Sequence, residues 1–432
     1  MASDKNQAPI IYNLFPRLVG PFPQWEPHLR RAKRLHFNWI FINPIQQAGF
    51  SGSMYSIKDY YKIDSRYLDP DSEKSPEAQL KNLIDIAHQL GLKVMIDLVI
   101  NHTAIDSVLV EQHPEWYKRD EAGKIVNPRA MDGDRVVAVW GDLAEIDNKN
   151  SPDRENLWRY WENLIDHFLN LGFDGFRCDA AYQVPASLWQ RLIRFSRKRN
   201  PEAVFFAESL GCPFEQVIEL GQAGFDFTFN SSKWWDFEAA WGLEQYEQNR
   251  LQAAPTVSFA ESHDTERLAA EYQGNWSAVQ MRYLFSVLFS TGVMMPIGFE
   301  FGFQKPLHVV RTRPQDWEKP SIDLQEFIRD ANQLKIRYPV FAQESLLETV
   351  ECGNPGVFAF RKISADNHQV GLVILNKDLQ APQQFRIKNL SEILERPQTT
   401  EFARGRPTRS GFSDEFEGIL SPAEVIVMVG NR

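Results

Sequence analysis

The sequence has few cysteines and no long apolar run. Its three cysteines, Cys178, Cys212 and Cys352, lie far apart, and no CxxC pair occurs. A disulfide framework and a structural zinc site are therefore not indicated. No apolar stretch approaches the roughly 20 residues that a membrane-spanning helix needs, and the polar N-terminus lacks the basic and apolar segments of a secretion signal. These absences predict a cytoplasmic protein with no membrane partner.

The chain also has fewer basic than acidic residues. The 47 Lys and Arg residues are outnumbered by 57 Asp and Glu residues, which gives a formal net charge of −10. This balance disfavours nucleic acid as a partner and favours a neutral or cationic ligand. Hydrophobic residues make up 43% of the chain and charged residues 24%, close to globular averages, so we expect a folded protein. Nothing in the sequence indicates an oligomeric state.

Short apolar runs alternate with amphipathic stretches over most of the chain. The apolar runs, typical of buried strands, are Ile10–Phe15, Trp39–Pro44, Val94–Asn101, Gly175–Asp179, Val204–Glu208, Phe225–Phe229, Val257–Ser262 and Val293–Phe299. The helical stretches are Trp25–Leu35, Pro76–Leu90, Arg154–Leu171, Ala186–Lys198, Phe214–Leu220, Asp236–Arg250, Ala278–Ser290 and Leu324–Ile336. Repeated strand–helix units predict a (β/α)8 barrel, although a doubly wound open sheet would give a similar pattern.

One connection between a strand and the next helix is much longer than the others. About fifty residues follow the third strand, whereas such loops usually take two to six residues, so we expect an inserted subdomain at residues 103–154. The barrel would then comprise residues 1–102 and 155–342. Residues 343–432 form a separate C-terminal domain in this prediction, because short alternating runs there indicate antiparallel strands.

Polar residues stand at the ends of four predicted strands. His102 follows the third strand, Asp179 ends the fourth, Glu208 ends the fifth, and His263 and Asp264 follow the seventh. The C-terminal ends of barrel strands meet at one rim, where active sites of such barrels lie. These residues are therefore our candidates for chemistry.

The segments that carry these residues resemble the four signature regions of the α-amylase superfamily, glycoside hydrolase family 13. The similar segments are Asp97–Thr103 (DLVINHT), Gly175–Ala180 (GFRCDA), Ala207–Ser209 around Glu208, and Ser262–Asp264 (SHD). The resemblance covers nearly the whole chain. It implies an α/β fold: a (β/α)8 TIM barrel with an inserted subdomain after strand 3 and a C-terminal antiparallel β-sandwich.

Cleavage of a glycosidic bond with retention needs a carboxylate that attacks the sugar and a carboxylic acid that protonates the leaving oxygen. We assign Asp179 as the nucleophile, because Arg177 lies two residues earlier on the same side of the strand and places a cation beside it. We assign Glu208 as the acid/base, because apolar neighbours favour a protonated carboxyl group. The resemblance implies the same two roles.

The resemblance implies further substrate contacts. Asp264 would be a third carboxylate that binds sugar hydroxyls and favours a distorted ring, while His102 and His263 would hydrogen-bond the same sugar. Tyr55 matches a tyrosine that stacks on sugar, and Arg177 lies in the same site. The role of Asp97 stays open: it would either support Arg177 or contact the sugar directly.

Three activities stay open at this point. We expect hydrolysis of α-1,4-glucosidic bonds in maltooligosaccharides or in glycogen- and starch-type α-glucans. The alternative is a transglycosidase, either a 4-α-glucanotransferase or a maltosyltransferase, because Tyr12–Gly20 and Gly49–Tyr55 (GFSGSMY) are similar to the maltosyltransferase branch. A non-catalytic binding scaffold is disfavoured, since such relatives usually lose a carboxylate and this chain keeps all three.

We expect no required cofactor. The resemblance implies a structural calcium ion near Asn101 and Asp142, in some members of the superfamily. The residues after the nucleophile, Ala180–Gln183, depart from the frequent Lys-His pair of the superfamily. This departure argues against both the ion and one substrate contact.

Overall fold

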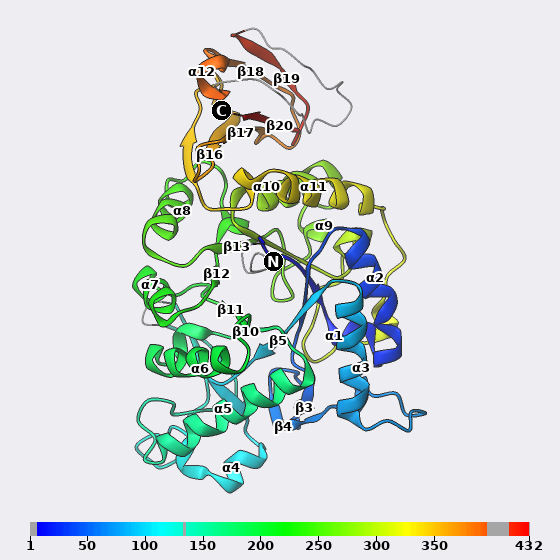
Figure 1. Cartoon of the computed structure of the whole chain (residues 1–432), viewed down its shortest axis with the longest axis vertical. Coiled ribbons are helices and arrows are strands. Elements are labelled where there is room, and N and C mark those ends of the chain that lie inside the picture. The colour runs from blue at the N-terminus through cyan, green and yellow to red at the C-terminus, as the bar shows by residue number, and fades with distance from the viewer. Residues whose placement is uncertain (1–6, 133–134, 395–413, 432) are drawn as a thin grey trace. The chain divides into compact units, whose positions relative to one another are not determined.

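Eight parallel strands close into a barrel in the computed structural model, which describes residues 7–132, 135–394 and 414–431. In barrel order they are β1 (Ile10–Leu14), β14 (Gly292–Pro296), β13 (Thr256–Phe259), β12 (Phe227–Phe229), β11 (Val204–Ala207), β10 (Gly175–Cys178), β5 (Lys93–Leu98) and β2 (Trp39–Ile42) (Figure 1). Each strand starts within two residues of the run that the sequence predicts. The predicted (β/α)8 fold is confirmed.

The chain divides into two units. Among the described residues, the first unit comprises those within Ile11–Phe229 and Leu307–Glu318, and the second comprises those within Asn6–Ile10, Asn230–Pro306 and Lys319–Arg432. Strands β2, β5, β10, β11 and β12 belong to the first unit, and β13 and β14 belong to the second.

Helices of the first unit follow its strands as the sequence predicts. They are α2 (Glu26–Arg34), α3 (Pro76–Gln89), α5 (Arg154–Leu171), α6 (Ala186–Arg199) and α7 (Phe214–Ala223), and α1 (Pro16–Val19) is an additional short helix. Local signals fix their ends: the Ser75 hydroxyl accepts the Ala78 N–H at the start of α3, and Gly172 ends α5 in the left-handed conformation.

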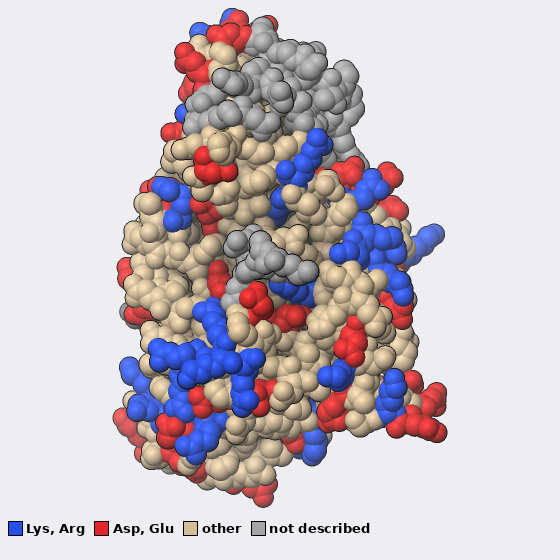
Figure 2. Space-filling view, viewed as in Figure 1, with Lys and Arg blue, Asp and Glu red and all other residues tan. Residues whose placement is uncertain are grey.

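Helix α6 is rich in arginine, and Lys and Arg side chains gather over the region of α5 and α6 in Figure 2. Most of these arginines have acidic partners. The ion pairs are Arg191 with Glu155 and Glu162, Arg197 with Asp226, and Arg199 with Asp166. The cluster is therefore largely neutralised by its own surroundings.

Two small antiparallel sheets and a hairpin are inserted between the barrel elements of the first unit. The segment between β5 and α5 carries β6 (His102–Ala104), α4 (Val108–Gln112), β7 (Arg129–Asp132), β8 (Arg135–Val139) and β9 (Leu143–Glu145), in which β6 pairs with β9 and β7 with β8. A hairpin of β3 (Gln46–Ala48) and β4 (Ile57–Ile63), which the sequence analysis does not predict, follows β2. The residue limits of the predicted domains stay predictions.

The helices of the second unit include α8 (Trp241–Gln252), α9 (Leu268–Glu271), α10 (Trp276–Phe289) and α11 (Gln325–Arg337). We expected α8 to begin at Asp236, and this start is wrong. The Asp236 carboxylate accepts hydrogen bonds from the N–H groups of Glu238 and Ala239, and Phe237 has a φ of 66°, so the chain forms a tight turn there.

Among the described residues, no helix is both long enough and apolar enough to cross a lipid bilayer.

The C-terminal part of the second unit is antiparallel, as the sequence predicts. One sheet has the order β15 (Leu346–Thr349), β16 (Val357–Ile363), β17 (Gln369–Asn376) and β20 (Val425–Asn431), and β18 (Gln383–Ile387) pairs with β19 (Phe416–Leu420). Helix α12 (Leu390–Leu394) packs with them. Leu372, Ile374, Phe385, Ile387 and Leu420 belong to the shared hydrophobic core, because alternate residues of each strand face inward.

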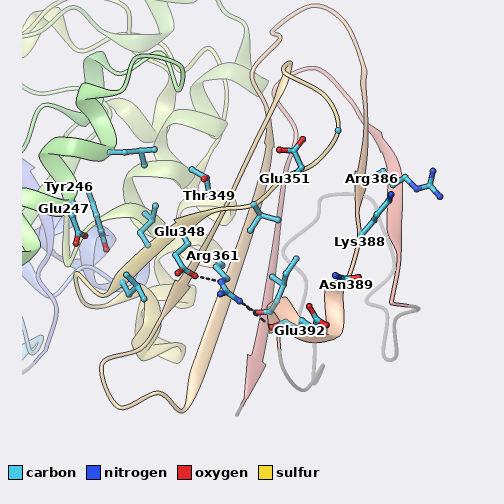
Figure 3. A pocket seen from close by; sticks show the side chains of 16 residues that line it. Tyr246, Glu247, Glu348, Thr349, Glu351, Arg361, Arg386, Lys388, Asn389 and Glu392 are labelled. Atoms are coloured by element: carbon cyan, nitrogen blue, oxygen red, sulfur yellow. Dashed lines mark hydrogen bonds and ion pairs between the residues drawn. The ribbon is translucent and has the colours of Figure 1, made fainter.

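A pocket of about 1240 Å³ in the second unit borders α8 and the edge strand β15 (Figure 3). Arg361 crosses it: its Nε donates to Glu348 at 2.6 Å, and its Nη1 donates to the backbone carbonyls of Glu392 and Ile393 in α12. The ring of Tyr246 is buried, and its hydroxyl donates to a backbone carbonyl. Arg361 thus links β16 with β15 and with α12.

Candidate active site

Arg177 joins two carboxylates in the first unit. Its Nη1 donates to both oxygens of Asp97, at 2.9 Å each, and to Asp179 Oδ1 at 2.7 Å. Arg177 stands opposite Asp97 in the register of β10 and β5, and Asp179 follows two residues later on the same side. The Asp179 side chain is 16% exposed, whereas the other two are almost fully buried. The guanidinium thus places a cation against the carboxylate that we expect to attack.

Asp97 is completely buried and supports its neighbours. Burial raises its pKa to about 6, although the charge of Arg177 opposes this shift. Besides Arg177, it accepts the Tyr55 hydroxyl proton at 2.6 Å. Asp97 is 0% exposed, and its carboxylate holds Arg177 and Tyr55 in place.

Glu208 lies directly after β11 and is tied to the turn that follows Asp179. Its Oε2 accepts the Ala180 N–H at 2.9 Å, and its Oε1 accepts the Leu210 N–H at 2.8 Å. Burial raises the pKa of Glu208 to about 7; Arg177 opposes this shift and the negative charge of Asp179 adds to it. A carboxyl group with such a pKa can be protonated near neutral pH, as a general acid must be.

Tyr55 and His102 complete the group in the first unit. The Tyr55 hydroxyl, which donates to Asp97, also accepts from Asn43 Nδ2 at 2.9 Å. His102 Nε2 lies 3.1 Å from the Tyr55 carbonyl oxygen. Burial lowers the pKa of His102 against the charge of Asp179, so the imidazole is neutral at pH 7. Hydrogen bonds and ion pairs thus connect Tyr55, His102, Arg177 and Asp179, and the Ala180 turn ties Glu208 to Asp179.

His263 and Asp264 belong to the second unit, where they follow β13. His263 Nε2 lies 3.0 Å from Asp264 Oδ2; the His263 side chain is buried, while that of Asp264 is 62% exposed. The turn is held by its own polar side chains, because the Asp264 N–H donates to the Ser262 hydroxyl and the Ser262 N–H donates to Thr265 Oγ1. The carboxylate of Asp264 is therefore accessible on a locally ordered turn.

A buried ion pair brackets this turn. Glu261 Oε1 accepts from Arg267 Nη1 at 2.6 Å, and Glu261 Oε2 accepts the Leu268 N–H at 2.6 Å. Arg267 Nη2 also donates to the Ile297 carbonyl at 2.7 Å. Both charged side chains are nearly inaccessible to solvent, so the pair fixes the two ends of the segment that carries His263 and Asp264.

Sequence reasoning did not identify several of these residues. Asn43, Glu261 and Arg267 position other side chains. For Glu261 the available signal was a charged residue directly before the SHD motif. Tyr182 was also missed: burial raises its pKa, and the negative charges of Glu208 and Asp179 act in the same direction. Its position three residues after Asp179 was the signal.

The calcium ion considered near Asn101 and Asp142 stays a prediction. Asn101 Oδ1 is buried without a hydrogen-bond partner among the described residues, but Asn101 Nδ2 donates to Gln183 Oε1 at 3.3 Å. Asp142 uses its backbone carbonyl to accept from Ile105 and Ser56. Calcium takes six to eight oxygen ligands, of which these contacts identify one unpartnered amide oxygen, Asn101 Oδ1.

One family model and several known proteins are similar to this chain. Residues 6–125 match the family model described as "Glycogen debranching enzyme, glucanotransferase domain". The chain is 25% identical over 391 residues to an alpha-1,4-glucan:maltose-1-phosphate maltosyltransferase of Burkholderia pseudomallei, which covers 87% of this chain and 33% of that protein. It is 24% identical to alpha-amylase MalA of Haloarcula japonica, over 78% of this chain and 50% of that protein. It is 26% identical to a 4-alpha-glucanotransferase of Thermotoga neapolitana, over 72% and 74%.

The chain thus spans about a third to a half of the length of the first two of these relatives. Among solved structures, the maltogenic alpha-amylase AmyB from Thermotoga neapolitana superposes with a TM-score of 0.76 at 22% identity and covers all of both chains. An alpha-amylase from Lactobacillus plantarum gives a TM-score of 0.74 at 23% identity, over 98% of this chain and 99% of that one. The resemblance of this chain to the α-amylase superfamily, which its four motifs predict, is confirmed.

Proposed function

We propose that the chain cleaves α-1,4-glucosidic bonds in maltooligosaccharides or α-glucans with retention of configuration. One observation carries the proposal: the Ala180 turn holds Glu208, with its pKa raised to about 7, next to Asp179, whose carboxylate faces Arg177. A protonated carboxyl group and a carboxylate beside a cation are the two groups that a retaining mechanism requires.

In the first step an Asp179 oxygen attacks the anomeric carbon. The bond to the leaving oxygen breaks, and Glu208 gives its proton to that oxygen, so the sugar stays on Asp179 as a glycosyl ester. In the second step Glu208, now a carboxylate, takes a proton from water while the water oxygen attacks the same carbon. The ester electrons return to Asp179, and two inversions leave the α-configuration unchanged.

The remaining candidates receive binding roles in this proposal. The exposed carboxylate of Asp264 binds sugar hydroxyls, and His263 orients that carboxylate through its 3.0 Å contact. Neutral His102, whose Nε2–H donates to the Tyr55 carbonyl, accepts a hydrogen bond from a sugar hydroxyl at Nδ1, and the partly exposed ring of Tyr55 packs against the sugar face.

Transglycosylation is the second candidate function. It uses the same glycosyl ester, but a sugar hydroxyl replaces water in the second step. The names of the maltosyltransferase and glucanotransferase relatives and of the matching family model favour it as strongly as the amylase relatives favour hydrolysis.

Product analysis distinguishes the two. Purified protein is incubated with maltotetraose, with and without glucose as acceptor, and the products are sized. Only shorter products support hydrolysis, and products longer than the substrate support transfer. Phosphate release from maltose 1-phosphate tests the maltosyl route. Absence of any cleavage or transfer, or normal turnover by Asp179→Asn or Glu208→Gln, would overturn the proposed function. Proton NMR showing the β-anomer first would overturn the retaining mechanism.

A further inference from the structure

Residues 49–56, which connect β3 to β4, carry Tyr55 and are called the Tyr55 loop below. The loop reverses direction at Gly52, whose N–H donates to the Gly49 carbonyl at 2.9 Å and whose φ is 74°. Tyr55 follows three residues later. The position of the Tyr55 ring therefore depends on what holds this loop.

The buried guanidinium of Arg17 joins the Tyr55 loop to a second segment of the first unit. Arg17 Nη1 donates to the Gly52 carbonyl at 2.9 Å. On the other side, its Nε donates to the Thr312 carbonyl at 3.2 Å and its Nη2 donates to the Val310 carbonyl. Backbone carbonyls cannot hydrogen-bond to one another, so the two segments need a shared donor. One guanidinium, with five N–H groups in a plane, serves both.

The second segment, residues 308–312, is a compact turn that we call the anchor turn. The Thr312 N–H donates to the His308 carbonyl at 3.1 Å, and the His308 N–H donates to Thr312 Oγ1 at 2.7 Å. His308 Nδ1 accepts two further N–H groups of the turn. The Met54 N–H of the Tyr55 loop donates directly to the Val309 carbonyl at 3.2 Å. The loop thus rests on a segment that its own hydrogen bonds hold in shape.

We propose that Arg17 is a positioning residue, which holds the Tyr55 loop on the anchor turn so that Tyr55 is in place before the sugar arrives. The inference rests on the proposed function, in which the Tyr55 ring packs against the sugar. A loop that is ordered in advance loses less conformational entropy when the ligand binds. Lysine cannot do the same, because its ammonium group is a compact point charge and not a planar fork that spans several acceptors.

Steady-state kinetics tests the effect on Tyr55. In Arg17→Lys we expect KM for maltotetraose to rise about tenfold and kcat to stay within about threefold, because the ring binds the ground state and the transition state alike. Arg313→Ala is the matched control. Arg313 is exposed and donates to the Val310 and Thr312 carbonyls, within the anchor turn, so its loss leaves the bridge to the loop intact. This variant should keep both constants within about twofold.

Amide hydrogen exchange tests the loop independently of activity. In Arg17→Lys, a peptide covering residues 49–56 should exchange about tenfold faster than in the wild type, while strand β10 exchanges as before. In Arg313→Ala both should be unchanged. If Arg17→Lys does not fold, Arg66→Gln takes its place, because the partly exposed Arg66 also donates to the Gly52 carbonyl, at 3.3 Å. Exchange in the loop should then rise about threefold.

The two measurements keep this inference and the proposed function apart. Unchanged exchange in the Tyr55 loop would overturn the positioning role, whether or not the protein cleaves sugar. Faster exchange throughout the first unit would show a role in stability alone and would overturn it as well, as would faster loop exchange with an unchanged KM. If the wild type turns over no maltotetraose, the proposed function is wrong, and exchange in the loop still decides whether Arg17 holds it.

Discussion

Ala180 donates its backbone N–H to the Glu208 carboxylate at 2.9 Å, one residue after Asp179. The candidate acid/base and the candidate nucleophile are therefore positioned by one turn of backbone, and a change in that turn moves one relative to the other. Ala180 has a φ of 39°, in the left-handed region that residues with a Cβ seldom adopt. This conformation directs the N–H toward Glu208.

The turn at Ala180 can be tested by substitution. Ala180→Val places a β-branched residue in the left-handed region, where such residues are outliers, so we expect the turn to relax and kcat to fall at least tenfold. Ala180→Gly relieves the strain and keeps the N–H, and it should retain kcat within a few fold. Steady-state kinetics on maltotetraose measures both. Equal activity of the valine and glycine variants would contradict this role.

The raised pKa of Glu208 predicts the basic limb of the pH profile. A general acid must be protonated, so kcat/KM should fall as the pH rises above about 7. The measurement is kcat/KM from pH 5 to 9. A profile that stays flat to pH 9 would contradict Glu208 as the acid.

The same group affects stability with a defined sign. Its folded pKa is raised above the unfolded value of about 4.5, so ionisation opposes folding, and the wild type loses stability as the pH rises from about 4.5 to 7. Glu208→Gln removes this loss. The variant should therefore gain thermal stability relative to the wild type when the pH is raised from 5 to 8, and an unchanged difference would contradict the buried state of this carboxyl group.

Substitutions at Arg177 distinguish its contribution to stability from its contribution to activity. Arg177→Met leaves Asp97 buried without its cation, and breaking such a pair costs about 3–5 kcal/mol. Asp97→Leu combined with Arg177→Met removes both charges and should recover much of the free energy of unfolding, measured in urea. It should not recover activity, because Asp179 still lacks its cation. Recovery of both quantities would show that Arg177 serves the fold alone.

Two buried lysines hold the C-terminal end of α10 in the second unit. Lys335 Nζ donates to the carbonyls of Ser290, Thr291 and Phe341. Lys362 Nζ donates to those of Phe289 and Gln343. The last carbonyls of a helix have no partner within the helix, so these ammonium groups satisfy buried acceptors.

Loss of one of these lysines should destabilise the second unit. Lys335→Met leaves three buried carbonyls unsatisfied, and we expect the free energy of unfolding to fall by about 2–4 kcal/mol. Lys319→Met, at an exposed position, serves as the matched control and should change it by less than about 0.5 kcal/mol. Urea unfolding followed by circular dichroism measures both. Equal stability of the two variants would contradict the capping role.

Local sequence patterns were sufficient to predict the barrel strands and to select the candidate carboxylates. Each strand is a short apolar run between turn residues, and this signal does not depend on distant segments, so β10 and β11 were predicted within a residue of their observed ends. The short strands β15 and β19 were not predicted. Strand β15 lies at a sheet edge and is partly exposed, so its sequence LLET lacks a clear apolar alternation.

The sequence by itself determined the order of strands and helices and which acids stand at strand ends, because these follow from the spacing of residues along the chain. Only the tertiary structure decided that Asp97 is fully buried, that Glu208 has a raised pKa, and that Asn101 Oδ1 is buried without a hydrogen-bond partner among the described residues. Burial and charge at one side chain depend on groups that are dozens of residues away in the sequence. Those distances are fixed when the chain folds, and no pattern of neighbouring residues encodes them.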